Sequence, residues 1–209
     1  MKKIILLTAA VLGTAMISCT SRHSLAKDIA GTWTGTPQSV ASTQTDATIT
    51  STDTYSFTPD EGTPGGTVMI TGMISMSAPM QPTDNVVSPY SVSASANATI
   101  TRTWNITDED DMEIVLDPKS LTVSVDPKAL ELRANVINGE QAPQIDSIAP
   151  AMAAQVKGVL TSSLTNYYLG IRHLEDVKVK NNNLEFEIEV PGGKDRDVIL
   201  HRDGPTSAL

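Results

Sequence analysis

The stretch YSVSASANATITRTWNIT (residues 90–107) alternates apolar and polar residues along almost its whole length. One face carries valine, alanine, isoleucine and Trp104, and the other face carries only serine, threonine and asparagine. A period of two is typical of a half-buried antiparallel strand. At about 3.3 Å per residue such a strand is roughly 55–60 Å long. We therefore expect it to coil or bend, as the strands of β-barrels do.

Shorter segments with strand-like patterns lie on both sides of this stretch. Strands are predicted at 31–39, 47–57, 67–77, 111–116, 121–125, 175–181, 184–190 and 198–202. The segment 67–77 is apolar on both faces, which predicts a central strand covered on both sides. A chain of 209 residues favours a single domain. We predict a mainly β fold, an antiparallel barrel of about eight to nine strands that occupies residues 29–209.

One segment follows helical spacing instead. Apolar residues recur from Ile148 to Tyr167 at intervals of three and four, and Gly170 follows them. Ser147 suits the N-cap and Pro150 the first turn. This predicts an amphipathic helix at about 148–169, inserted before the C-terminal hairpin and lying across a barrel mouth or one sheet face.

Charge sets the expected register of that hairpin. If Asn182 and Asn183 form a two-residue turn, Lys180 faces Glu185 and Lys178 faces Glu187. Asparagine tolerates the positive φ that a type I′ turn requires. Opposite charges then meet across the strands, which favours this register.

The N-terminus has the pattern of a lipoprotein signal. Lys2 and Lys3 precede an apolar stretch from Ile4 to Ile17, which is too short to span a membrane. The run Met16-Ile17-Ser18-Cys19 resembles the lipobox of bacterial lipoproteins, in which the cysteine is lipidated after cleavage. This resemblance implies a signal peptide at 1–18, a lipidated tether at 19–28, and an outer-membrane location facing the periplasm, with the cell surface as the alternative. The other interpretation is an ordinary signal peptide with a free thiol nearby.

Composition excludes several function classes. The formal net charge of −9 argues against nucleic acid, which needs a basic face. One cysteine excludes a disulfide framework, and three scattered histidines offer no metal cluster. The acidic run from Asp108 to Asp111 lacks the spacing of a calcium loop and fits a solvated hairpin tip. With no nucleophile motif or phosphate loop, we expect no enzyme and no cofactor or metal.

A short motif near the start of the barrel region points to a family. The Gly31-x-Trp33 element resembles the N-terminal motif of lipocalins and related calycins. The resemblance implies that the tryptophan closes the barrel base and that an arginine near the last strand, here Arg202, packs over its ring. The chain as a whole looks like the small lipocalin-like lipoproteins of Bacteroidetes-type bacteria. It departs from lipocalins in placing the helix before the final strands.

Two charges occupy positions that are otherwise apolar. Asp53 and Arg102 lie on the apolar faces of their strands, where an isolated charge is costly. They should pair or contact a polar ligand group, unless they lie in a bulge or beyond the barrel rim. With Tyr55, Met73 and Met76 they form the predicted ligand-binding set, because methionine suits an adaptable pocket.

These observations leave two function classes. The first is a membrane-anchored, lipocalin-like barrel that binds a small apolar or amphipathic ligand in its interior. The second is a structural or protein-interaction lipoprotein of the cell envelope with a filled barrel. In both, Cys19 joins the protein to the membrane.

Overall fold

The computed structural model describes residues 21–43, 46–80, 90–134, 145–189 and 194–202. The predicted signal peptide and Cys19 lie outside these residues. The elements are β1 (Gly31–Thr34), β2 (Gln38–Val40), β3 (Thr48–Pro59), β4 (Gly65–Met80), β5 (Tyr90–Ile106), β6 (Met112–Leu116), η1 (Pro118–Ser120), β7 (Thr122–Val125), η2 (Pro127–Ala129), β8 (Glu131–Ala134), α2 (Ile145–Leu169), β9 (His173–Lys180), β10 (Asn183–Ile188) and β11 (Arg196–Arg202).

The strands close into an antiparallel barrel, as predicted. The order β1-β11-β10-β9-β6-β5-β4-β3 returns to β1, because β1 pairs with both β11 and β3. β2 continues the sheet beyond β3, and β7 and β8 pair with β5. β5 thus pairs with β4 along one edge and with β6, β7 and β8 in succession along the other. The alternation in residues 90–107 correctly predicted this central strand.

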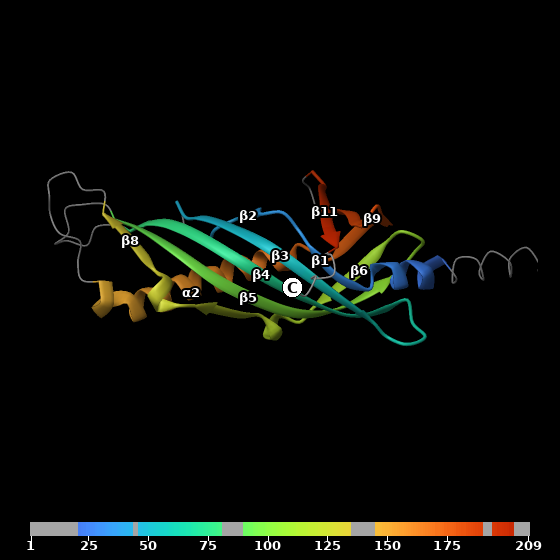
Figure 1. Ribbon diagram of the computed structural model, residues 1–209, viewed down its shortest axis with the longest axis horizontal. Helices are drawn as coiled ribbons and strands as arrows, with labels where there is room; N and C mark the ends of the chain where they lie inside the picture. The colour runs from blue at the N-terminus through green and yellow to red at the C-terminus, as the bar shows by residue number, and fades with distance from the viewer. Residues whose placement is uncertain (1–20, 44–45, 81–89, 135–144, 190–193, 203–209) are drawn as a thin grey trace, which may run out of the picture.

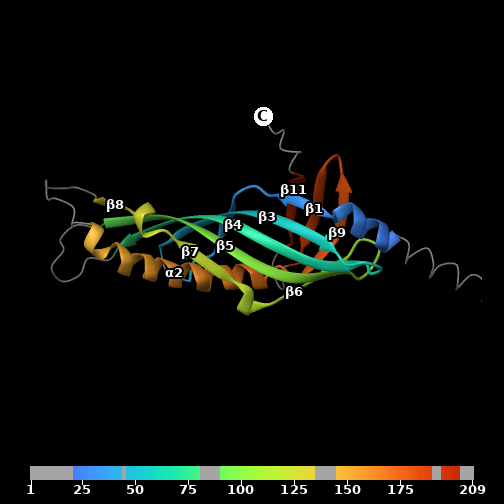
Figure 2. The same cartoon turned by 60° about the horizontal axis from the view of Figure 1, so that its bottom comes forward.

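The three longest strands extend well beyond the closed part of the barrel, which gives the molecule an elongated shape (Figure 1). β3, β4 and β5 form a long twisted sheet, and β9, β10 and β11 stand at one end of it (Figure 2). Helix α2 runs along the long arm of this sheet in both views. The inward face of β5 carries three consecutive alanines, Ala94, Ala96 and Ala98, and all three side chains are buried. These small residues leave room for a helix close to the sheet.

Helix α2 is the predicted inserted helix, but it begins earlier than expected. It starts at Ile145, so Ser147 lies within its first turn rather than at the N-cap. Its buried stripe includes Met152, Val156 and Leu160 and ends at Tyr168, which is fully buried. The amide of Thr43 donates to the hydroxyl of Ser163, which joins the loop after β2 to this buried face.

The β9–β10 turn lies one residue earlier than the sequence predicted. Asn181 and Asn182 both have positive φ, and Asn183 pairs with Lys180. Lys178 consequently faces Glu185, with 3.6 Å between the ammonium nitrogen and the carboxylate oxygen. The prediction of a two-residue asparagine turn with positive φ was correct, but three consecutive asparagines allow two positions for that turn.

A helical segment at residues 21–29 precedes β1, where the sequence predicted only a polar tether. Ala26 and Ile29 are buried, and the indole nitrogen of Trp33 donates to the carbonyl of Ile29 at 2.7 Å. The guanidinium of Arg22 donates to the carbonyl of Thr107 at 3.4 Å. The segment therefore packs at the end of the barrel where the β5–β6 loop lies.

Candidate functional site

Asp53 and Arg102 both point into the barrel. Their side chains are 4% and 1% exposed, and each lies in an uninterrupted antiparallel register with β4. Neither residue lies in a bulge or beyond the rim. The two charges are joined through the last turn of α2, which enters the barrel between them.

Three hydroxyl groups surround the Asp53 carboxylate. Ser51 and Tyr168 donate to Oδ1, the latter at 3.1 Å, and Tyr167 donates to Oδ2 at 3.1 Å. Ser51 lies two residues away on the same face of β3, whereas both tyrosines come from α2. The carboxylate thus holds the end of the helix against the barrel wall.

Arg102 binds the same helix end through its guanidinium group. Its two terminal nitrogens donate to the carbonyls of Tyr168 at 2.6 Å and of Ile171 at 2.9 Å. Its guanidinium carbon lies 5.3 Å from the centre of the Tyr168 ring. The last carbonyls of a helix have no partner within the helix, and the helix dipole places partial negative charge there. Arg102 therefore supplies donors and a complementary charge at this helix end, where the Tyr168 carbonyl also accepts from the amide of Ile171 at 3.1 Å.

Gly72 makes room for this cluster. It lies opposite Asp53 on β4, and a Cβ atom added to it would come within 2.8 Å of Asp53 Oδ1 and of the Tyr168 hydroxyl, and 2.9 Å of the Ser51 hydroxyl. The oxygen atoms of the cluster are thus packed directly against the β4 backbone at Gly72. No larger residue fits at this position without displacing them.

Burial perturbs the titratable groups of the cluster. It raises the pKa of Asp53, and the hydrogen bonds from Ser51, Tyr168 and Tyr167 oppose this effect. Burial also raises the pKa values of Tyr167 and Tyr168, and the nearby Asp53 charge raises them further. Both tyrosines remain protonated donors at neutral pH. Groups with perturbed pKa values beside a cleft are candidates for a functional site.

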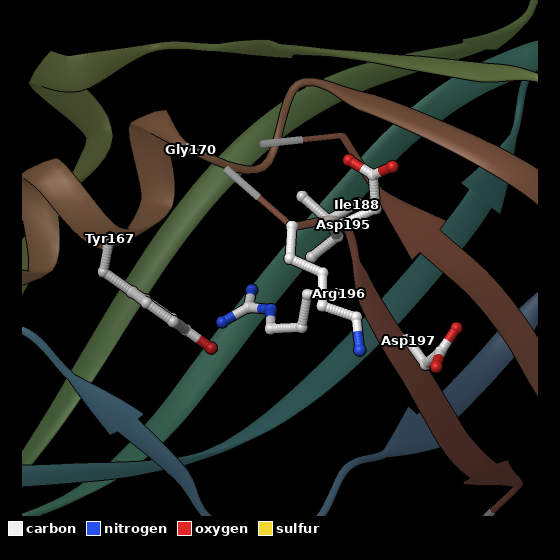
Figure 3. Close-up of a pocket in the computed structure, with 7 residues that line it drawn as sticks. Tyr167, Gly170, Ile188, Asp195, Arg196 and Asp197 are labelled. Carbon is white, nitrogen blue, oxygen red and sulfur yellow. The ribbon is translucent and has the colours of Figure 1, made fainter. Parts of the chain in front are cut away.

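Two clefts open beside the cluster at the mouth of the barrel, where α2 ends. The larger has a volume of about 520 Å³ and is lined by Tyr167, Gly170, Ile188, Lys194, Asp195, Arg196 and Asp197 (Figure 3). The smaller, of about 20 Å³, reaches Asp53 and shares Tyr167 and Arg196 with the larger. That volume suffices for one water molecule.

Arg196 lies where the two clefts meet. Its guanidinium carbon is 5.4 Å from the centre of the Tyr167 ring. Within the described ranges its Nε has no hydrogen-bond partner although it is buried. In Figure 3 the guanidinium points toward the Tyr167 hydroxyl. The mouth therefore places an arginine, an aromatic ring and an apolar side chain around one cleft.

The other predicted ligand residues divide between the two faces of the sheet. Tyr55 and Met76 are buried in the interior. Met73 is 64% exposed on the outer face, so its assignment to an interior pocket was wrong. Met69 is also 46% exposed, so the outer face of the 67–77 strand is not covered as predicted. The strand is central because β3 and β5 flank it, and a mixture of threonine, serine and methionine does not distinguish a covered face from an open one.

Trp33 and Arg202, the motif residues, meet at the other end of the barrel. The Arg202 guanidinium carbon lies 4.4 Å from the centre of the buried Trp33 ring, and Nη2 donates to the carbonyl of Asp28 at 2.7 Å. Gly31 has a φ of 120°, which side-chain-bearing residues rarely adopt. Arg196 and Arg202 thus mark opposite ends of β11.

Sequence patterns did not reveal Gly72, Tyr168 or Arg196 as members of the site. Tyr167 was visible only as the last residue of a helical stripe. The signal that the sequence did offer was a charged residue on the inward face of two strands, Asp53 and Arg102, because buried charges need polar partners inside the barrel. Among the described residues, no group of three or more histidine, cysteine, aspartate and glutamate side chains is arranged to hold a metal ion.

No family model, no curated protein and no solved structure matches the chain. Within the part of the chain that the structure describes, no helix has the length and apolar character needed to cross a membrane.

Proposed function

We propose that this protein is a lipid-anchored protein of the bacterial cell envelope that binds a small amphipathic molecule at the mouth of its barrel. The observation that carries the proposal is the cleft of about 520 Å³ beside Tyr167 and Arg196. Small-molecule sites are concave, of roughly 300–1,000 Å³, with mostly apolar walls and a few polar groups that fix orientation. The proposal includes no catalytic step and no cofactor.

The cleft suits a ligand with an apolar body and an anionic end. The Tyr167 ring, Ile188 and Gly170 offer apolar contact. Arg196 presents a planar fork of donors that matches a carboxylate, and its guanidinium borders both clefts. Lys194, Asp195 and Asp197 also line the cleft, so its charged residues balance and Arg196 is the group that would bind the anionic end. The site is at the mouth rather than in the interior, because α2 occupies the barrel at the level of Asp53 and Arg102.

Titration of the full chain with a fluorescent fatty acid tests this proposal. We expect saturable uptake, and we expect Arg196→Gln to weaken it about tenfold, which corresponds to about 1.4 kcal/mol. Arg172→Gln is the matched control, because Arg172 is exposed just beyond α2 and does not line the cleft. Absence of uptake, or equal weakening by both substitutions, would refute a ligand site at the mouth.

The membrane anchor is proposed at Cys19, two residues before the helical segment 21–29. That segment packs against the barrel end that holds Trp33 and Arg202, opposite the mouth. The mouth would then point away from the membrane and be open to ligands.

Cys19→Ala tests the anchor separately. It should abolish labelling by a palmitate analogue and release the protein from membranes, since stable attachment needs more than one acyl chain. Unchanged labelling would place the lipid elsewhere or remove it from the proposal.

A second function is favoured by the occupied interior. Asp53 and Arg102, the charges that a ligand was expected to satisfy, are bonded to α2 instead. A filled barrel is suited to a protein-interaction role in the envelope through its outer surface. Reproducible crosslinking of one membrane-associated protein, combined with absence of fatty-acid uptake, would favour this function over ligand binding.

A further inference from the structure

The outer face of the three longest strands carries no charged residue. Twenty side chains point outward from it, six on β3 between Thr48 and Thr58, six on β4 between Thr67 and Ser77, and eight on β5 between Ser91 and Asn105. Sixteen are serine or threonine, two are asparagine and two are methionine. This neutrality is unexpected in a chain of which 19% is charged, because lysine, glutamate and aspartate normally occupy exposed positions.

The hydroxyl groups form a regular array. Across the sheet, Thr50 faces Ser75, which in turn faces Ser95. Thr54 likewise faces Thr71, which faces Thr99. Neighbouring strands lie about 4.8 Å apart, and residues on one face of a strand recur at about 6.8 Å. Each hydroxyl can both donate and accept a hydrogen bond. The face therefore offers closely spaced, uncharged donors and acceptors in two dimensions.

A cleft of about 510 Å³ hollows the middle of this face. Its floor includes Thr50, Thr52, Met73, Ser75, Ser95 and Asn97, and Pro37 and Ala129 bound it on opposite sides. Asp126 also lines the cleft, and its carboxylate accepts from the amide of Lys128 in its own turn. Met73 and Ile74 are the large apolar residues of the lining; Met73 is 64% exposed, whereas Ile74 is buried.

We propose that this outer cleft is a second binding site, which takes a neutral glycan chain. Sugars carry hydroxyls that donate and accept, as the side chains here do, and they have apolar C–H faces that Met73 and the threonine methyl groups can contact. Methionine is flexible and polarizable, so its side chain adapts to such surfaces. The site is independent of the mouth cleft, because the two share no lining residue.

The lining is uncharged except for Asp126, and this favours an uncharged ligand. An acidic polymer would lose hydration here and meet no positive charge, and a basic polymer would meet the single charge of Asp126 in an otherwise uncharged lining. A protein partner is disfavoured, because the cores of protein interfaces are enriched in aromatic residues and arginine, and the cleft lining has neither.

Titration of the full chain in detergent with chitohexaose, cellohexaose and maltohexaose, followed by NMR or calorimetry, tests the proposal. We expect saturable binding of at least one of these neutral oligosaccharides at millimolar concentration, and none of the acidic oligomer tetragalacturonate. Met73→Glu should weaken binding at least about tenfold, because it places a charge in the cleft.

Met69→Glu is the matched control. Met69 lies on the same strand and face and is also exposed, but it does not line the cleft. It should leave the affinity unchanged within about twofold. Binding to none of the neutral probes, preference for the acidic one, or equal loss in both variants would overturn the proposal. Concentration-dependent dimers that Met73→Glu disrupts would do so as well, since a second copy would then occupy the face.

Discussion

Gly72→Ala tests whether the buried cluster around Asp53 is as tightly packed as its geometry indicates. The new Cβ would lie 2.8 Å from both Asp53 Oδ1 and the Tyr168 hydroxyl, closer than such atoms approach one another. Overpacking of this kind costs about 1–3 kcal/mol. Loss of one of the cluster's hydrogen bonds adds about 1 kcal/mol, whereas replacing a glycine within a strand gains about 0.5–1 kcal/mol. We therefore expect a net loss of about 1–3 kcal/mol in the free energy of unfolding.

Urea denaturation measures this loss, and Gly158→Ala is its control. Gly158 lies on the exposed side of α2, and a Cβ added there meets no atom within 4 Å. In a helix interior the change from glycine to alanine should stabilise by about 0.8–1 kcal/mol. The same chemical change is therefore expected to have opposite signs at the two sites.

A second variant identifies the atom responsible for the clash. Tyr168→Phe removes the hydroxyl that lies 2.8 Å from the new Cβ. In this background Gly72→Ala should cost less than in the wild-type protein, a coupling that a double-mutant cycle measures. If Gly72→Ala is neutral or stabilising, or if its cost is the same in both backgrounds, the oxygen atoms of the cluster do not rest on β4 as described.

Three further substitutions probe the charged residues. Arg102→Met should destabilise by about 3 kcal/mol in urea denaturation, because it removes the charged donor to the Ile171 carbonyl and one of the two donors to the Tyr168 carbonyl, which keeps the Ile171 amide. A loss below about 1 kcal/mol would contradict this. Arg202→Gln should lower the free energy of unfolding by about 1 kcal/mol through loss of its contact with the Trp33 ring, and unchanged stability would show that the contact is unimportant. Burial raises the pKa of Asp53 above 3.8, so the folded state binds this proton more tightly than the unfolded state. The contribution of Asp53 to the free energy of unfolding should fall as the pH rises from 3.8 through the folded pKa, and it should be constant above that pKa. Asp53→Asn should remove this part of the pH profile of stability. An unchanged profile would disprove the raised pKa of Asp53.

The barrel and its helix were predictable because they depend on local periodicity. The alternation of residues 90–107 predicted both the central strand and its inward face, including the burial of Trp104. The helical stripe ended at the right place, since α2 ends at Leu169. Errors arose where neighbouring residues offered equivalent chemistry. Asn181, Asn182 and Asn183 allow two turn positions, and the positive φ values select the first.

The candidate site was only partly predictable, because its members are joined by tertiary contacts. Two interior charges on β3 and β5 required polar partners, and the sequence suggested either each other or a ligand. The partners are instead two tyrosine hydroxyls and two carbonyls at the end of α2. Which end of a helix enters a barrel depends on packing that no pattern within the strand or the helix specifies.

The same alternation in β3, β4 and β5 determines both faces of the long sheet. Inward positions carry Gly72, Ala96 and Ala98, whose small size lets α2 approach the sheet and insert its last turn into the barrel. Outward positions carry hydroxyl side chains and no charge. A fold that required only solubility would place lysine or glutamate on the open face, as exposed strands normally do. The inward residues are therefore explained by packing, whereas the neutral outward residues are not, and this difference assigns the outer face a role in binding.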